Sequence, residues 1–166
     1  MSTPFTTWMD DGCLRFFIIE DKFQMPATFS ELGLHFLYPE NWLLQSEEAD
    51  AATTGVIFEL PSGGFFSVET IEEEPDYDSV IQQIEQAFVD EYGETEAEEF
   101  PTDPEQMAGV HLAFDFRFYY LDLLIISRLM FLRAGNQNYI LQFQAEIRDF
   151  ESNEMVIAAI LKQIAS

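Results

Sequence analysis

Basic side chains are scarce in this sequence. Its 166 residues contain 7 Lys and Arg against 31 Asp and Glu, which gives a formal net charge of -24 at pH 7. No Lys or Arg lies between Lys22 and Arg117. Because a surface of this charge repels polyanions and anionic headgroups, we expect neither a nucleic acid nor a membrane as a partner. The charge itself has two interpretations: a solubilising shell, or a surface that attracts a basic partner.

Cysteine and long apolar runs are also nearly absent. The single cysteine, Cys13, excludes an intramolecular disulfide framework and fits a reducing compartment. Asp10 and Asp11 stand where a secretory signal would carry positive charge, and the apolar run after them is interrupted by Arg15. No other uncharged run approaches the length of a membrane span. We therefore expect a cytoplasmic protein.

The residues that usually carry catalysis or bind metals form no motif. His35 and His111 are the only histidines, and their spacing is not that of a metal site. No known local motif surrounds Cys13, so an inert thiol is the simpler interpretation. The carboxylates of residues 72–78 lack the spacing of a calcium loop, which leaves weak, adventitious cation binding at most. The sequence thus predicts no catalytic residue, no metal site, no cofactor and no enzymatic activity.

Apolar and aromatic residues, in contrast, are abundant. Hydrophobic residues make up 48% of the chain and aromatic residues 15%, with 17 Phe, which is typical of a chain that folds around a core. We expect one domain over residues 29–166, and an amino-terminal arm over residues 1–28 with a possible extra strand at residues 13–19. The chain length suits a single domain of this kind.

The first half of the domain shows strand signals followed by one helix. Residues 33–38 alternate as a strand that Pro39 ends, after a turn-prone segment at residues 25–27. Residues 47–54 lack periodicity and predict a loop. Two β-rich runs, 55–60 and 65–71, flank a Pro/Gly turn and predict a hairpin. Apolar residues then recur at three- and four-residue steps over 76–92, which predicts an amphipathic helix capped by Gly93.

The second half begins with an acidic segment that allows at most a short edge strand, over residues 94–106. A three-stranded meander follows: a strand around residues 112–118 with one buried face, an apolar central strand at residues 123–133 after a turn at Leu121-Asp122, and a third at residues 139–145. A terminal helix has Asp149 or Ser152 as its N-cap candidate. The fold class is therefore α+β, an antiparallel sheet flanked by helices.

One segment carries a family resemblance. The run from Gly33 to Trp42, in which a strand ends in Tyr38-Pro39 and a Trp follows three residues after the proline, resembles the PsbP/Mog-like superfamily, including its DcrB-type members. The order of the later elements is similar too, so the resemblance covers roughly residues 29–166. It implies an α/β/α sandwich around an antiparallel sheet. It transfers no functional residue and no common chemistry.

Our leading functional hypothesis is a non-enzymatic protein-binding module, an adaptor or chaperone-like protein. Five aromatic or aliphatic residues at strand starts and turns are its candidate contact residues, although core packing explains them as well. The partner would be a basic or amphipathic protein segment, and a homodimer through the same surface is a variant. A carrier of an apolar small molecule is the alternative, and an uncharacterised enzyme is the third reading. The candidate contact residues are Phe65, Phe66, Tyr119, Tyr120 and Leu121.

Overall fold

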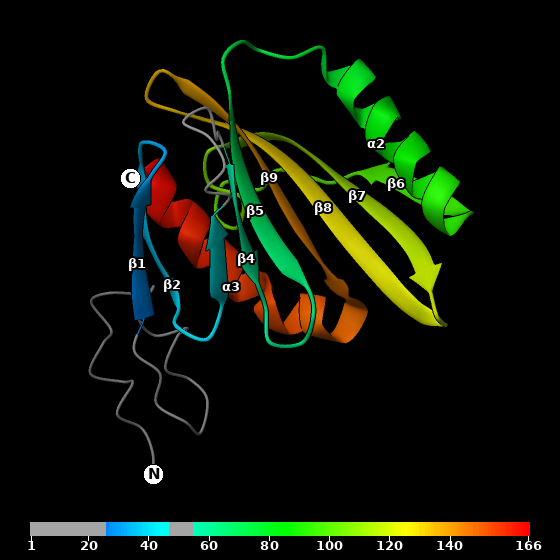
Figure 1. The fold of residues 1–166 in the computed structure, drawn as a ribbon. Helices are drawn as coiled ribbons and strands as arrows, with labels where there is room; N and C mark the ends of the chain where they lie inside the picture. The colour runs from blue at the N-terminus through cyan, green and yellow to red at the C-terminus, as the bar shows by residue number, and fades with distance from the viewer. Residues whose placement is uncertain (1–25, 47–54) are drawn as a thin grey trace.

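The computed structural model describes residues 26–46 and 55–166 and contains nine strands and two helices in these ranges (Figure 1). The predicted strand at residues 13–19, most of the predicted arm and the predicted loop at 47–54 lie outside the described residues. The strands are β1 (Pro26–Glu31), β2 (Leu34–Pro39), β3 (Leu43–Ser46), β4 (Gly55–Glu59), β5 (Phe65–Ile71), β6 (Thr95–Glu99), β7 (Val110–Tyr120), β8 (Leu123–Ala134) and β9 (Gln137–Glu146), and the helices are α2 (Tyr77–Tyr92) and α3 (Ile147–Ala165).

Seven of these strands form one antiparallel sheet in the order β3-β4-β5-β9-β8-β7-β6. The predicted hairpin is β4–β5 and the predicted meander is β7–β8–β9, so both are confirmed. The two units join where β5 pairs with β9, with Phe66 opposite Phe143. The acidic segment supplies β6, which is an edge strand as expected.

The two helices pack on opposite faces of this sheet (Figure 1). Strand β8 shows why, because successive side chains of a strand point to opposite faces. Leu129 and Phe131 pack in the cluster under α2, whereas Met130 and Leu132 pack in the cluster under α3. All four side chains are almost completely buried. The expected α/β/α arrangement is therefore confirmed.

A separate two-stranded sheet, β1–β2, covers part of α3 and the core on that side. Our expectation of a turn at residues 25–27 is wrong for Pro26 and Ala27, which begin β1. Pro26 stands at the first position of its strand, where a missing N–H is tolerated. The chain reverses at Leu32 and Gly33 instead, both with positive φ. Phe29 and Phe36 then pack against each other at 4.9 Å between ring centroids.

The helix limits agree with the sequence for α2 and differ for α3. Helix α2 ends at Tyr92, and Gly93 caps it with a φ of 92°, a conformation that favours glycine. The N-cap of α3 is Glu146, whose side chain accepts a hydrogen bond from the Arg148 backbone N–H, so the prediction of Asp149 or Ser152 is wrong. Strand β9 runs directly into the helix, and Phe150 in its first turn stacks on Phe143 at 4.6 Å.

Candidate functional site

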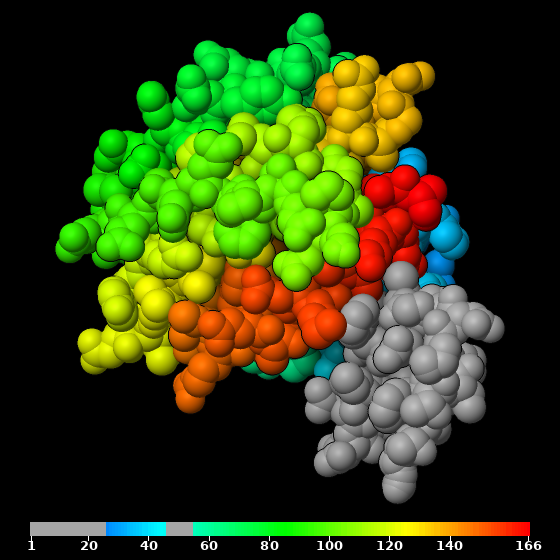
Figure 2. All heavy atoms as spheres, turned by 180° about the vertical axis from the view of Figure 1, so that it is seen from behind, coloured from blue at the N-terminus to red at the C-terminus, as the bar shows by residue number. Residues whose placement is uncertain are grey.

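The β7–β8 hairpin extends beyond its neighbours on both sides. Pairing of β6 with β7 stops at Thr95 opposite Phe118, and pairing of β9 with β8 stops at Glu146 opposite Ile125. Residues 119–124 therefore continue as a two-stranded ribbon with no strand beside it in the described sheet. Figure 2 shows this end of the hairpin in yellow, projecting at the lower left.

The ribbon exposes a group of large apolar side chains, which we call the hairpin patch: Tyr119, Tyr120, Leu121 and Leu123. Their exposed fractions are 65%, 51%, 76% and 44%, respectively. Tyr120 and Leu123 face each other across the ribbon, and Leu121 occupies the turn between them. Clusters of large apolar residues that remain exposed mark partner surfaces more often than isolated ones do. The patch is thus the leading candidate for a contact surface.

The turn at the end of the patch has an unfavourable backbone conformation. Leu121 and Asp122 connect the paired residues Tyr120 and Leu123, and their φ angles are 52° and 67°. Positive φ at both central residues is the pattern of a type I′ turn, for which Asn-Gly is favoured. A leucine is strained there by about 1–2 kcal/mol, because its Cβ atom comes too close to the following carbonyl oxygen. An exposed leucine in a strained turn does not stabilise the fold. This favours a role for Leu121 in contacts with another molecule.

The patch stands on a rigid aromatic base at the end of α2. Tyr92 stacks on Phe118 with 4.3 Å between ring centroids, and Tyr120 meets Tyr92 edge-on at 5.6 Å. Burial raises the pKa of Tyr92 above its ordinary value, and the nearby Glu91 carboxylate, which also forms a hydrogen bond with it, raises it further. Tyr92 is therefore neutral at physiological pH and anchors the ribbon by packing alone.

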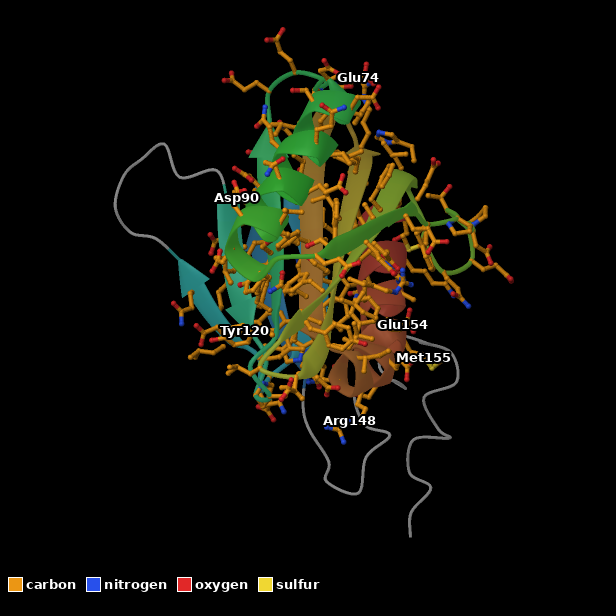
Figure 3. The ribbon with its side chains drawn as sticks, turned by 90° about the vertical axis from the view of Figure 1, so that its right-hand side faces the viewer. Glu74, Asp90, Tyr120, Arg148, Glu154 and Met155 are labelled. Carbon is orange, nitrogen blue, oxygen red and sulfur yellow. The ribbon has the colours of Figure 1, made fainter. Side chains whose placement is uncertain are left out.

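Exposed carboxylates lie in the turn of the hairpin patch and on the neighbouring end of α2. Asp122 lies in the turn itself, and exposed Asp90 and Glu91 occupy the last turn of α2. Figure 3 shows Tyr120 at the lower end of the hairpin, with Asp90 on the neighbouring helix. Arg148, at the start of α3, already pairs with Glu146 at 3.3 Å. A ligand that contacted this surface would meet an apolar centre with a negative rim.

The predicted contact residues do not form one surface. Phe66 is completely buried in the core and leaves the candidate set. Phe65 is partly exposed in a surface hollow of about 460 Å³ beside the β4–β5 turn, where it lies near Ile57 and Leu60. Strands β9 and β8 separate β5 from β7, so Phe65 is not part of the hairpin patch. Tyr120 and Leu121 do lie together, whereas Tyr119 belongs to the same end of the hairpin but points to its opposite face. Sequence reasoning missed Leu123, although the turn expected at Leu121-Asp122 places it beside them.

A second candidate lies on the α3 side of the sheet, around Arg128. Its guanidinium donates to both carboxylate oxygens of Asp115, at 2.7 and 3.0 Å, and to Glu154 at 3.1 Å. It also lies 3.6 Å above the centre of the Phe100 ring. Asp115 is only 2% exposed, so the expectation of a single buried face on β7 is wrong. Helix α3 covers the second face, and Arg128 makes burial of the carboxylate tolerable.

The hollow beside Arg128 holds about 370 Å³ and lies between α3 and the segment before β7. Three carboxylates line it, from Glu105, Glu151 and Glu154, against the cations of Arg128 and Lys162. Glu154 and Met155, which also line the hollow, are labelled on α3 in Figure 3. Because Arg128 is already neutralised by Asp115 and Glu154, we interpret this network as structural and not as an anion-binding site.

The remaining titratable residues give no site in the part of the chain that the structure describes. No group of three or more His, Cys, Asp or Glu in these ranges could hold a metal ion. His111 hydrogen-bonds to the Tyr77 hydroxyl at 2.9 Å, and Glu74 accepts from the same hydroxyl at 3.2 Å. Burial, helped by Glu74, raises the pKa of Tyr77. Within residues 26–46 and 55–166, neither helix combines the length and the apolar character needed to cross a bilayer.

Comparison with known proteins gives a fold and no close relative. No protein-family model matches the sequence, and no curated protein matches it. Among solved structures, cyanobacterial PsbP from Synechocystis is similar with a TM-score of 0.54 and 12% identity, over 86% of this chain and 93% of that one.

Two further solved structures are less similar. A protein of unknown function from Pseudomonas aeruginosa has a TM-score of 0.41 at 13% identity, over 78% of this chain and 89% of that one. LpqN of Mycobacterium tuberculosis, described as involved in cell envelope biogenesis, has a TM-score of 0.35 at 12% identity, over 86% and 83%. The fold assignment depends on the cyanobacterial protein because both of these scores are below 0.5. The chain therefore has an α+β fold similar to that of PsbP, as the Gly33–Trp42 segment predicted.

Proposed function

We propose that this chain is a non-enzymatic protein-binding module that holds a basic or amphipathic protein segment against the hairpin patch. The observation that carries the proposal is the exposed, strained Leu121 at the end of a projecting ribbon, with two exposed tyrosines beside it. Tyrosine and leucine supply apolar contact area, and Tyr in particular is enriched where interfaces gain most of their energy. We place the module in the cytoplasm, because a chain with a single cysteine fits a reducing compartment.

The charge distribution supports a basic partner. With a formal net charge of -24, the chain attracts cationic segments over distances of about 8 Å at physiological salt and repels a second copy of itself. The carboxylates around the patch would accelerate encounter, and the apolar centre would retain the bound segment. The carrier alternative loses support, because both sheet–helix interfaces are occupied by completely buried side chains, such as Met130 and Ile160 under α3 and Phe116 under α2.

The test is retention of partners from a lysate of the source organism on three immobilised forms: wild type, Tyr119→Ser/Leu121→Ser, and Leu43→Ser/Met155→Ser. The last is a matched control, because Leu43 and Met155 are also exposed, at 61% and 57%, and lie outside the patch. We expect wild type and control to retain the same protein and the patch variant to lose it. Binding at low salt should exceed binding in about 0.5 M salt, where the Debye length is only a few Å. Retention of nothing by wild type, or equal retention by all three forms, would contradict the proposal.

A further inference from the structure

The hairpin patch does not explain how an elongated partner would be held. Resting on the proposed function, we propose that the edge strand β6 binds an extended basic segment as an added strand, adjacent to the hairpin patch. Strand addition is a common mode of peptide recognition, in which main-chain hydrogen bonds give affinity and alternate side chains give selectivity. The described part of the sheet ends at β6, so its outer side is the place for such an addition.

The hydrogen-bond phase of β6 identifies the groups available to a partner. The Phe100 N–H donates to the Ala113 carbonyl at 2.8 Å, just beyond the last pair of the ladder, Glu99 opposite Phe114. In an antiparallel pair the bonded residues alternate. Glu96 and Glu98 therefore direct their N–H and C=O groups toward β7. The same groups of Thr95, Ala97 and Glu99 point away from β7, toward the open edge.

Electrostatics select the partner of this edge. Strand β6 and the residue before it carry four carboxylates, all exposed, and the nearest cation, Arg117, pairs with Glu98 at 3.2 Å and lies 3.8 Å from Asp115. Charged edges normally prevent pairing with other chains, and here they exclude a second copy of this acidic chain. A segment with Lys or Arg at alternate positions has the charge that complements the carboxylates of β6. The four carboxylates belong to Glu94, Glu96, Glu98 and Glu99.

The edge and the hairpin patch are continuous. Strand β7 runs two residues past the end of its pairing with β6, to Tyr119 and Tyr120. A segment added to β6 would cover about 17 Å along five residues and then reach these tyrosines. The opposite edge, β3, offers no equivalent, because its sequence Leu43–Ser46 carries no charge. Basic residues in the strand followed by an apolar residue would therefore fit this side of the molecule.

The probe is a nine-residue peptide of alternating Lys and Val with blocked ends, and its control has Glu in place of Lys. Binding of each fluorescent peptide is measured by anisotropy at about 20 mM salt to wild type, Ala97→Pro and Ala97→Val. Proline at position 97 removes an N–H that β7 does not use, and proline is tolerated on edge strands. The valine variant keeps that donor. Loss of one hydrogen bond and of close approach should weaken binding at least about fivefold in Ala97→Pro, with Ala97→Val unchanged and the Glu peptide not bound.

Amide hydrogen exchange of the wild-type protein gives a readout independent of any substitution. The amides of Thr95, Ala97 and Glu99 should exchange rapidly in the free protein and slowly once the Lys peptide is bound. Unchanged exchange at these amides, slowing at β3 instead, or equal peptide affinity of the Pro and Val variants would overturn strand addition. Should the patch variant lose its lysate partner while Ala97→Pro keeps it, the protein-binding function stands and only the role of β6 fails.

Discussion

Leu121 shows how one residue can work against the stability of its own fold. Its side chain is 76% exposed, so it contributes little packing, and its backbone adopts a conformation that a leucine disfavours. The next residue, Asp122, has a positive φ as well. A turn optimised for folding would use Asn-Gly at these two positions. The conformational strain of Leu121 and Asp122 has a functional reason if Leu121 contacts a partner.

Replacing the turn should therefore separate stability from binding. For Leu121→Asn with Asp122→Gly we expect the free energy of unfolding to rise by about 1 kcal/mol, because both residues then fit positive φ. The measurement is a urea titration in which the midpoint rises while the slope is unchanged. The same variant should retain less of the partner. Asp122→Gly alone is the control: it should also stabilise the protein, and it should keep the partner because Leu121 remains. A lower urea midpoint for the double variant would show that Leu121 and Asp122 do not strain this turn.

At the scale of elements, two ion pairs that share Arg128 connect three elements. Asp115 belongs to β7, Arg128 to β8, and Glu154, which also binds Arg128, to α3. Arg128→Met should lower the free energy of unfolding by about 3–5 kcal/mol, because it leaves the buried Asp115 carboxylate with only the longer contact to Arg117, at 3.8 Å. Adding Asp115→Leu should restore much of the loss, since both charges are then gone. Urea titrations of the single and double variants measure the coupling. Additive losses would show that the two charges act independently.

Sequence periodicity predicted the elements whose signal is local. The stripe of α2, the alternation of β7 and the two apolar faces of β8 each arise from consecutive residues, so the helix and the meander were correct. The start of α3 was predicted wrongly. Phe150 packs on Phe143 in the preceding strand, so the helix begins earlier than the capping signal of Asp149 suggests. Strand β1 was missed because Pro26 resembles a turn until β2 is placed beside it.

The candidate site was predictable only in part, for the same reason. A turn at Leu121-Asp122 could be predicted from the sequence, and with it the position of Tyr119, Tyr120 and Leu121 at one end of a hairpin. The projection of the β7–β8 hairpin beyond its neighbours could not be predicted, because it depends on where β6 and β9 stop pairing. Phe65 and Phe66 are neighbours in sequence, yet a strand turns them to opposite faces, and only the sheet order shows which one the core buries.

At the scale of the whole molecule, charge is the dominant unbalanced quantity. With 31 acidic and 7 basic residues, the folded chain concentrates like charges that the unfolded chain holds further apart. Strand β6 and the end of α2 place carboxylates side by side on one flank. The hydrophobic core must outweigh this repulsion, so the balance depends on the ions in solution.

Added salt should therefore stabilise this protein. Between about 10 mM and 150 mM NaCl the Debye length falls from about 30 Å to about 8 Å, which screens the repulsion between exposed carboxylates. We expect the urea midpoint to rise over this range and then to level off, because the buried Asp115–Arg128 pair is screened much less. CaCl₂ at matched ionic strength is the control: an equal rise indicates screening alone, whereas a larger one indicates that carboxylates bind the cation directly. A midpoint that fell with NaCl would mean that attraction between exposed charges, and not repulsion, dominates the electrostatic part of the folding free energy.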